Sequence, residues 1–127
     1  MKLRIKGNSL RLRVSRSELE HFLAGSRIEE TIHFAAASQA KLIYALESTL
    51  QASAVRVRYR PQEVTVILSD EQARIWGKDS EVGVYTSVDI GSTGSLEVII
   101  EKDFACLDRS DEDNGDTFDN PHAGTVC

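Results

Sequence analysis

Hydrophobic and polar residues alternate with a period of two through most of the first hundred positions, as expected for half-buried β-strands. The alternation predicts strands at residues 1–7, 9–14, 27–34, 41–47, 54–60, 63–68, 82–90 and 95–103. Two segments interrupt it. SRSELEHFLAG and SDEQARIWG each place a serine three residues before Glu or Gln and end in glycine, which is the pattern of a short capped helix.

The pattern of the first half corresponds to that of the second half when the chain is shifted by 54 residues. The shift superimposes the two predicted helices, and it aligns Lys2, Arg4 and Lys6 with Arg56, Arg58 and Arg60. Few residues are identical, so the shift predicts a repeated order of strands and helices and leaves common ancestry open. We therefore expect a single β-rich domain at 1–103, with pseudo-repeats 1–53 and 54–103, followed by an acidic, loosely ordered tail at 104–127.

Eight predicted strands and two short helices indicate a mainly β (α+β) fold. Each strand has one apolar face, so the strands must bury these faces against one another. An eight-stranded antiparallel barrel formed by two ββαββ pseudo-repeats would do so with few exposed edges. An antiparallel sandwich of the same elements is the alternative.

Cations are concentrated on one face of the first predicted hairpin, MKLRIKGNSLRLRV. A two-residue loop at 7–8 places Arg4 opposite Arg11 and Lys2 opposite Arg13. Guanidinium groups suit phosphate and carboxylate ligands, so an anion-binding face is one interpretation. The alternative is a solvated sheet face whose cations discourage edge pairing. The candidate anion-binding residues are Lys2, Arg4, Lys6, Arg11, Arg13, Arg56, Arg58 and Arg60.

Acidic residues are concentrated in the tail. The net charge of the chain is −5, whereas residues 103–127 alone carry seven acids and one cation. One hypothesis is that this tail folds back onto the cationic face as an internal anion. Its sequence lacks the ligand spacing of a calcium loop, and Cys106, His122 and Cys127 lack the short spacing of a zinc site.

A candidate metal site follows from the last predicted strand. Period-two spacing places Glu97, Glu101 and Asp103 on one face, and Mg²⁺ prefers carboxylate oxygens together with substrate phosphates. Salt bridges to the neighbouring cations are the alternative use of these carboxylates. No other cofactor is indicated.

Two stretches, MKLRIKGNSLRLR and IEKDFACL, are followed by an acidic cluster and by Phe118-Asp119-Asn120-Pro121. Together they resemble a group of small bacterial proteins classified only as a domain of unknown function, in which the last motif reads Phe-Pro-Asn-Pro. This resemblance spans nearly the entire chain and implies no activity.

The order of elements over residues 1–103 is also similar to that of the triphosphate tunnel (CYTH-like) enzymes. That resemblance implies a wide barrel with interior Arg and Lys for triphosphate and paired strand carboxylates for metal. The Glu-x-Glu-x-Lys motif of those enzymes is replaced here by Lys2-Leu3-Arg4-Ile5-Lys6.

Three functional hypotheses remain: an anion-binding module, a Mg²⁺-dependent polyphosphate or triphosphate hydrolase of tunnel type, and a structural or interaction protein without a small-molecule site. The chain has no apolar stretch of bilayer length and no signal-peptide pattern, which predicts a cytoplasmic protein without a membrane partner. Its acidity and its aromatic content of 6% disfavour nucleic-acid binding. Ligand identity, catalysis and oligomeric state are left open.

Overall fold

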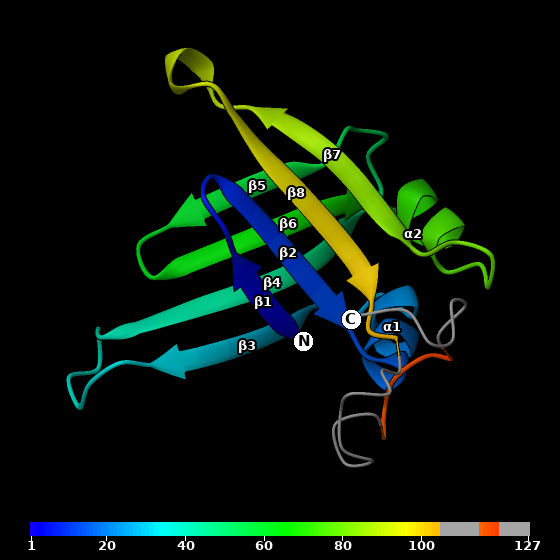
Figure 1. The fold of residues 1–127 in the computed structure, drawn as a ribbon, viewed down its shortest axis with the longest axis horizontal. Coiled ribbons are helices and arrows are strands. Elements are labelled where there is room, and N and C mark those ends of the chain that lie inside the picture. The colour runs from blue at the N-terminus through cyan, green and yellow to red at the C-terminus, as the bar shows by residue number, and fades with distance from the viewer. Residues whose placement is uncertain (105–114, 120–127) are drawn as a thin grey trace.

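The computed structural model describes residues 1–104 and 115–119, which form two four-stranded sheets packed face to face with two helices at one end (Figure 1). Sheet A has the order β1-β2-β8-β7, with strands Lys2–Ile5, Ser9–Val14, Ser95–Lys102 and Gly83–Asp89. Sheet B has the order β3-β4-β6-β5, with strands Ile28–His33, Lys41–Thr49, Glu63–Ser69 and Arg56–Arg60. The mainly β prediction is confirmed, and of the two alternatives the sandwich is the one observed.

Each sheet takes one hairpin from each half of the chain. The outer pairs β1–β2, β3–β4, β5–β6 and β7–β8 are antiparallel, whereas the central pairs β2–β8 and β4–β6 are parallel. The two halves are therefore joined through the parallel centres of both sheets. The sequence pattern predicts the hairpins but not these central pairings.

Registers of the central pairs, and of hairpins β1–β2 and β5–β6, correspond between the two sheets, whereas the β3–β4 register differs by two residues from that of β7–β8. In sheet A Ser9 lies opposite Glu97, and in sheet B Glu63 lies opposite Ile43, which are the same two positions after a shift of 54 residues. The hairpin register expected for the opening segment, with Arg4 opposite Arg11, is also observed. Outer-face positions on the first three strands of sheet A (β1, β2, β8) therefore have counterparts on β5, β6 and β4 of sheet B.

Helices α1 (Arg16–Leu23) and α2 (Asp70–Trp76) begin with capping boxes, as the sequence predicts. The Ser15 hydroxyl accepts a hydrogen bond from the Glu18 N–H at 3.3 Å, and the Glu18 carboxylate accepts one from the Ser15 N–H at 3.0 Å. Ser69 and Gln72 form the same reciprocal pair at α2. No helix among the described residues is long and apolar enough to cross a bilayer.

The hydrophobic core fills the space between the sheets and continues beneath both helices. It contains Leu12, Val14, Val98 and Ile100 from sheet A and Leu46, Val66 and Leu68 from sheet B. Phe22 of α1 and Trp76 of α2 meet edge to face with ring centroids 6.0 Å apart. Because strand side chains alternate between faces, most charged residues of both sheets point away from this core, whereas Lys102 of β8 lies on the same face as Val98 and Ile100 and is buried.

Candidate anion-binding site

The predicted cationic residues lie on two opposite faces of the sandwich. Because the core separates the two sheets, the two groups do not share a cavity. Sheet A carries Lys2, Arg4, Lys6, Arg11 and Arg13 on and beside β1 and β2, whereas sheet B carries Arg56, Arg58 and Arg60 on β5.

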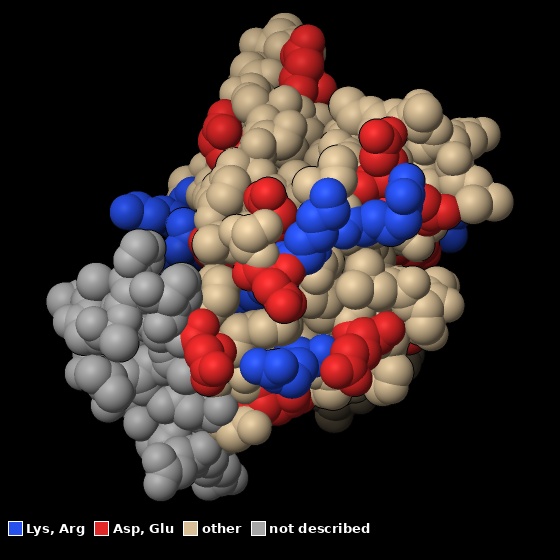
Figure 2. Space-filling view, turned by 90° about the vertical axis from the view of Figure 1, so that its right-hand side faces the viewer, with Lys and Arg blue, Asp and Glu red and all other residues tan. Residues whose placement is uncertain are grey.

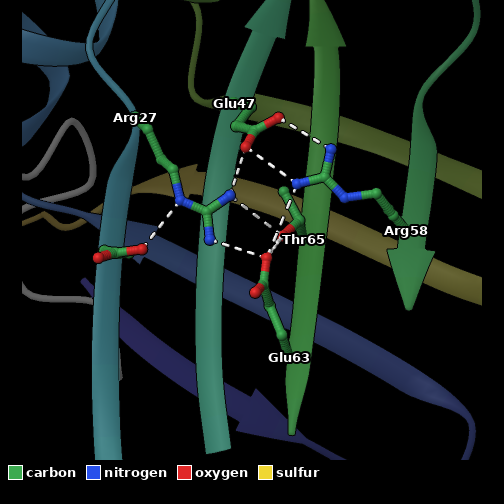
Figure 3. Close-up of polar contacts among 6 residues, drawn as sticks. Arg27, Glu47, Arg58, Glu63 and Thr65 are labelled. Atoms are coloured by element: carbon green, nitrogen blue, oxygen red, sulfur yellow. Dashed lines mark hydrogen bonds and ion pairs between the residues drawn. The ribbon is translucent and has the colours of Figure 1, made fainter. Parts of the chain in front are cut away.

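On sheet B, the outer face holds a closed group of ion pairs, which we call the sheet B network: Arg27, Glu29, Glu47, Arg58, Glu63 and Thr65 (Figure 3). Arg27 donates to Glu29 and Glu63 at 2.9 Å each, and it also donates to Glu47. The Arg58 guanidinium donates to the two Glu47 oxygens at 3.0 and 3.4 Å. The chain's own glutamates therefore neutralise Arg58.

The sheet B network also covers the centre of its face. Thr65 and Ala45 point outward from sheet B, yet their exposed fractions are only 0% and 1%. Figure 3 shows the two guanidinium groups and the carboxylates converging over this part of the sheet. The network occupies the surface on which an external ligand would otherwise lie.

Hydrogen bonds within the sheet B network lower the pKa values of two of its carboxylates. Burial tends to raise the pKa of Glu47, but hydrogen bonds from Arg27 and Arg58 outweigh burial and lower this pKa below its ordinary value. Hydrogen bonds from Arg27 and Thr65 lower the pKa of Glu63. Both carboxylates thus remain charged to a lower pH than in the unfolded chain.

We predict that the stability supplied by the network depends on pH. Since the folded-state pKa values of Glu47 and Glu63 are lowered, their contribution is present above the unfolded value of about 4.3 and is lost as the pH falls through the folded values. Melting temperatures of the wild type and Glu47→Gln, measured by circular dichroism from pH 7 to pH 3, should differ at pH 7, and the difference should shrink as the pH falls below about 4.3. If the difference in melting temperature stays constant over this range, the ion pairs of Glu47 do not stabilise the fold as described.

On sheet A, the outer face has a pocket where sheet B has the network. The pocket, which we call the sheet A pocket, has a volume of about 200 Å³ and is lined by Arg4, Lys6, Ser9, Arg11 and Ile99. No acidic residue is among these lining residues. Arg11 Nε lies 3.2 Å from Glu101, whereas Arg4 and Lys6 have no ion pair within the part of the chain that the structure describes.

Differences at corresponding positions explain why ion pairs cover the outer face of sheet B, whereas the outer face of sheet A has a pocket. Arg4 of sheet A corresponds to Arg58, and Glu101 corresponds to Glu47. At two further positions the sheets differ, because Ser9 replaces Glu63 and Arg11 replaces Thr65. Over these four positions sheet A therefore has one carboxylate fewer and one cation more than sheet B; elsewhere Arg13 stands where sheet B has Ile67, and Glu97 stands where sheet B has Ile43.

The three carboxylates predicted for Mg²⁺ have separate partners along sheet A. Glu97 accepts hydrogen bonds from the hydroxyls of Ser87 and Ser95 at 2.9 and 3.4 Å. Glu101 accepts from the Tyr85 hydroxyl at 2.9 Å, and Asp103 pairs with Lys2 at 2.9 Å. Among the described residues, no three His, Cys, Asp or Glu side chains are grouped to hold a metal ion.

A second cavity lies at the start of α1, with a volume of about 360 Å³, and residues of both charges line it. Asp116, from the described part of the tail, accepts hydrogen bonds from the Ser17 N–H and hydroxyl at 3.2 and 2.5 Å, which lower its pKa. Phe118 packs edge to face on Phe104 with centroids 6.0 Å apart. The described tail thus places its own carboxylate at α1 and not over the sheet A pocket; Cys106, His122 and Cys127 lie outside the described residues.

Lys102 is a buried cation that the sequence reasoning missed. Its exposed fraction is 4%, and burial lowers its pKa. Its ammonium donates to the Lys78 carbonyl at 2.6 Å and lies 5.6 Å from the centre of the Phe118 ring. These contacts stabilise the buried ammonium group, which is not among the residues that line the sheet A pocket.

Charges on the side of the molecule that carries the helices are of mixed sign. Figure 2 shows this side, with basic groups interspersed among acidic groups. A concentration of cations with no acidic residue among the lining residues is found instead at the sheet A pocket. Ser9 and Ile99 were not predicted for this site, although the 54-residue shift, which aligns Ser9 with Glu63, contained the signal for Ser9.

Comparisons with known proteins agree with the resemblance inferred from the opening and closing motifs. Neither a curated protein nor a solved structure matches the chain. A family model does match, over residues 1–122, and its description is "Family of unknown function (DUF7009)". Because this match covers nearly the whole chain, the protein belongs to DUF7009, a family of unknown function.

Proposed function

We propose that the protein is an anion-binding module whose ligand, a phosphate or a carboxylate, lies in the sheet A pocket. The observation that carries the proposal is the contrast between corresponding positions of the two sheets. Arg58 in sheet B is held by Glu47 and Glu63, whereas Arg4 in sheet A has no ion pair among the described residues and has Arg11 beside it. An external anion would take the place that Glu63 fills in sheet B.

Electrostatics within the hairpin support this proposal. Arg4 and Arg11 lie directly opposite each other on paired strands, and like charges in this position destabilise a sheet by about 0.2–1 kcal/mol. A bound anion would remove this repulsion. The guanidinium groups offer forked donors for its oxygens, and Lys6 adds a third cation. Because the pocket is open to solvent, we expect binding to weaken as salt concentration rises.

Titration of the full chain tests the proposal. We expect inorganic phosphate, pyrophosphate, triphosphate or citrate to give saturable binding by calorimetry at low salt, and Arg4→Ala to weaken it by about tenfold or more, since charge-assisted hydrogen bonds contribute about 1.5–3 kcal/mol. Arg74→Ala, on the exposed side of α2, makes the same change in net charge and is expected to leave the affinity unchanged.

Three results would count against the proposal or redirect it. An absence of saturable binding, or equal losses in Arg4→Ala and Arg74→Ala, would contradict it. An equal loss in Arg58→Ala would also contradict it, because Arg58 lies on the opposite face of the sandwich. Each titration is repeated with Mg²⁺, because turnover of triphosphate that needs Mg²⁺ and disappears in Glu101→Gln would favour the hydrolase hypothesis instead.

A further inference from the structure

We infer that the ligand of the sheet A pocket carries an aromatic or other flat apolar group beside its anionic group, and this inference rests on the proposed function. The outer face of sheet A has a row of residues in register across all four strands: Arg4, Arg11, Ile99 and Tyr85. The row passes from two cations to an aliphatic side chain and then to an aromatic ring. A small organic phosphate or carboxylate with a ring matches this order of chemistry.

Ile99 forms the apolar part of the pocket surface. It lines the pocket together with the cations and is only half-buried. Tyr85 lies opposite Ile99 on the next strand, and its exposed fraction is 58%. Adjacent strands are about 4.8 Å apart, so the backbone of Tyr85 lies about 10 Å from that of Arg11. A ligand anchored at the cations would therefore extend over Ile99 towards the exposed ring.

The position of the Tyr85 ring is tied to that of the cations. Its hydroxyl donates to one oxygen of Glu101 at 2.9 Å, and the other oxygen of Glu101 lies 3.2 Å from Arg11 Nε. One carboxylate thus fixes both the aromatic ring and a guanidinium. The guanidinium can donate hydrogen bonds to an anion, and the ring offers a stacking surface at a set distance from it. This suits a ligand that has both an anionic group and a ring.

Sheet B lacks this arrangement in the corresponding row. There the residues in register are Arg58, Thr65, Ala45 and Glu29. Thr65 and Ala45 are fully covered, and Glu29 is paired with Arg27 at 2.9 Å. The exposed apolar and aromatic positions are thus a feature of the face that also has the unneutralised cations.

Two phosphate monoesters of equal charge test the inference on the full chain. We expect phenyl phosphate to bind at least about fivefold more tightly than methyl phosphate, because stacking on an aromatic side chain stabilises a bound ring. Tyr85→Ala should reduce the affinity for phenyl phosphate to that for methyl phosphate and leave methyl phosphate unchanged. Tyr85→Phe keeps the ring without its hydroxyl and should retain most of the preference.

Failure of this inference is distinguishable from failure of the proposed function. Equal binding of the two esters, or an equal loss for both in Tyr85→Ala, would overturn the inference while leaving the anion site in place. If neither ester nor inorganic phosphate binds, the proposed function fails and this inference fails with it. A preference that survives Tyr85→Ala would also overturn the role of the ring.

Discussion

Replacing Trp76 with alanine should lower the free energy of unfolding by about 3–5 kcal/mol, the usual cost of removing a fully buried large aromatic side chain. The exposed fraction of Trp76 is 1%, and its ring meets Phe22 of the other helix edge to face. Its indole N–H donates to the Val82 carbonyl at 3.3 Å, so the substitution also removes this hydrogen bond, although the carbonyl keeps the Lys102 N–H as a donor at 3.1 Å. Urea denaturation followed by circular dichroism measures the change.

Ile75→Ala is the matched control on the same helix. Ile75 is 45% exposed, so its truncation should cost much less than that of Trp76. Similar losses in the two variants, or a loss below about 1 kcal/mol for Trp76→Ala, would contradict the view that the two helices close one end of the core through their aromatic contact.

Much of the fold could be predicted from the sequence because its local signals agree with one another. Period-two alternation indicated the strands, and Ser15 and Ser69 marked the starts of both helices. The loop at Gly7 was predicted with its register, and Gly7 does adopt a positive φ of 55°. Strands, helix starts and hairpin loops depend on residues that are close together in the chain, so the spacing of residue types is enough to predict them.

Pairing between the two halves could not be predicted. Alternation shows which side of a strand is apolar, but it does not show which strand lies beside it. The parallel pairs β2–β8 and β4–β6 join segments that are far apart in sequence. The choice of a sandwich over a barrel has a physical basis in the edge strands β1 and β5, whose cations oppose further pairing.

The candidate site was predicted in part. The cations of the opening hairpin lie on one face in the expected register, because both properties follow from the alternation and the two-residue loop. The separation of these cations from Arg58 depends on how the sheets pack, which the alternation does not specify. The sheet B network brings together Arg27, Glu47 and Glu63 from three strand regions, so it follows only once the strand order is known.

Ser9→Glu should reduce phosphate binding by about 100-fold or more while removing none of the cations. The new carboxylate would stand at the position that Glu63 occupies in sheet B, beside Arg4 and Arg11. It would form ion pairs with these guanidinium groups and repel an incoming anion. Loss of two charge-assisted hydrogen bonds, each contributing about 1.5–3 kcal/mol, accounts for the expected size of the effect. Calorimetric titration with inorganic phosphate at low salt measures it.

Two control variants show whether the effect of Ser9→Glu comes from the charge at position 9, from the size of the new side chain or from the change in net charge. Ser9→Gln has nearly the same size without the charge, and we expect it to retain binding within a few-fold of the wild type. Ser80→Glu adds the same charge at an exposed position after α2 and should leave the affinity unchanged. If Ser9→Glu binds phosphate as the wild type does, or if Ser9→Gln loses binding to the same extent, then the missing carboxylate is not what makes sheet A differ from sheet B.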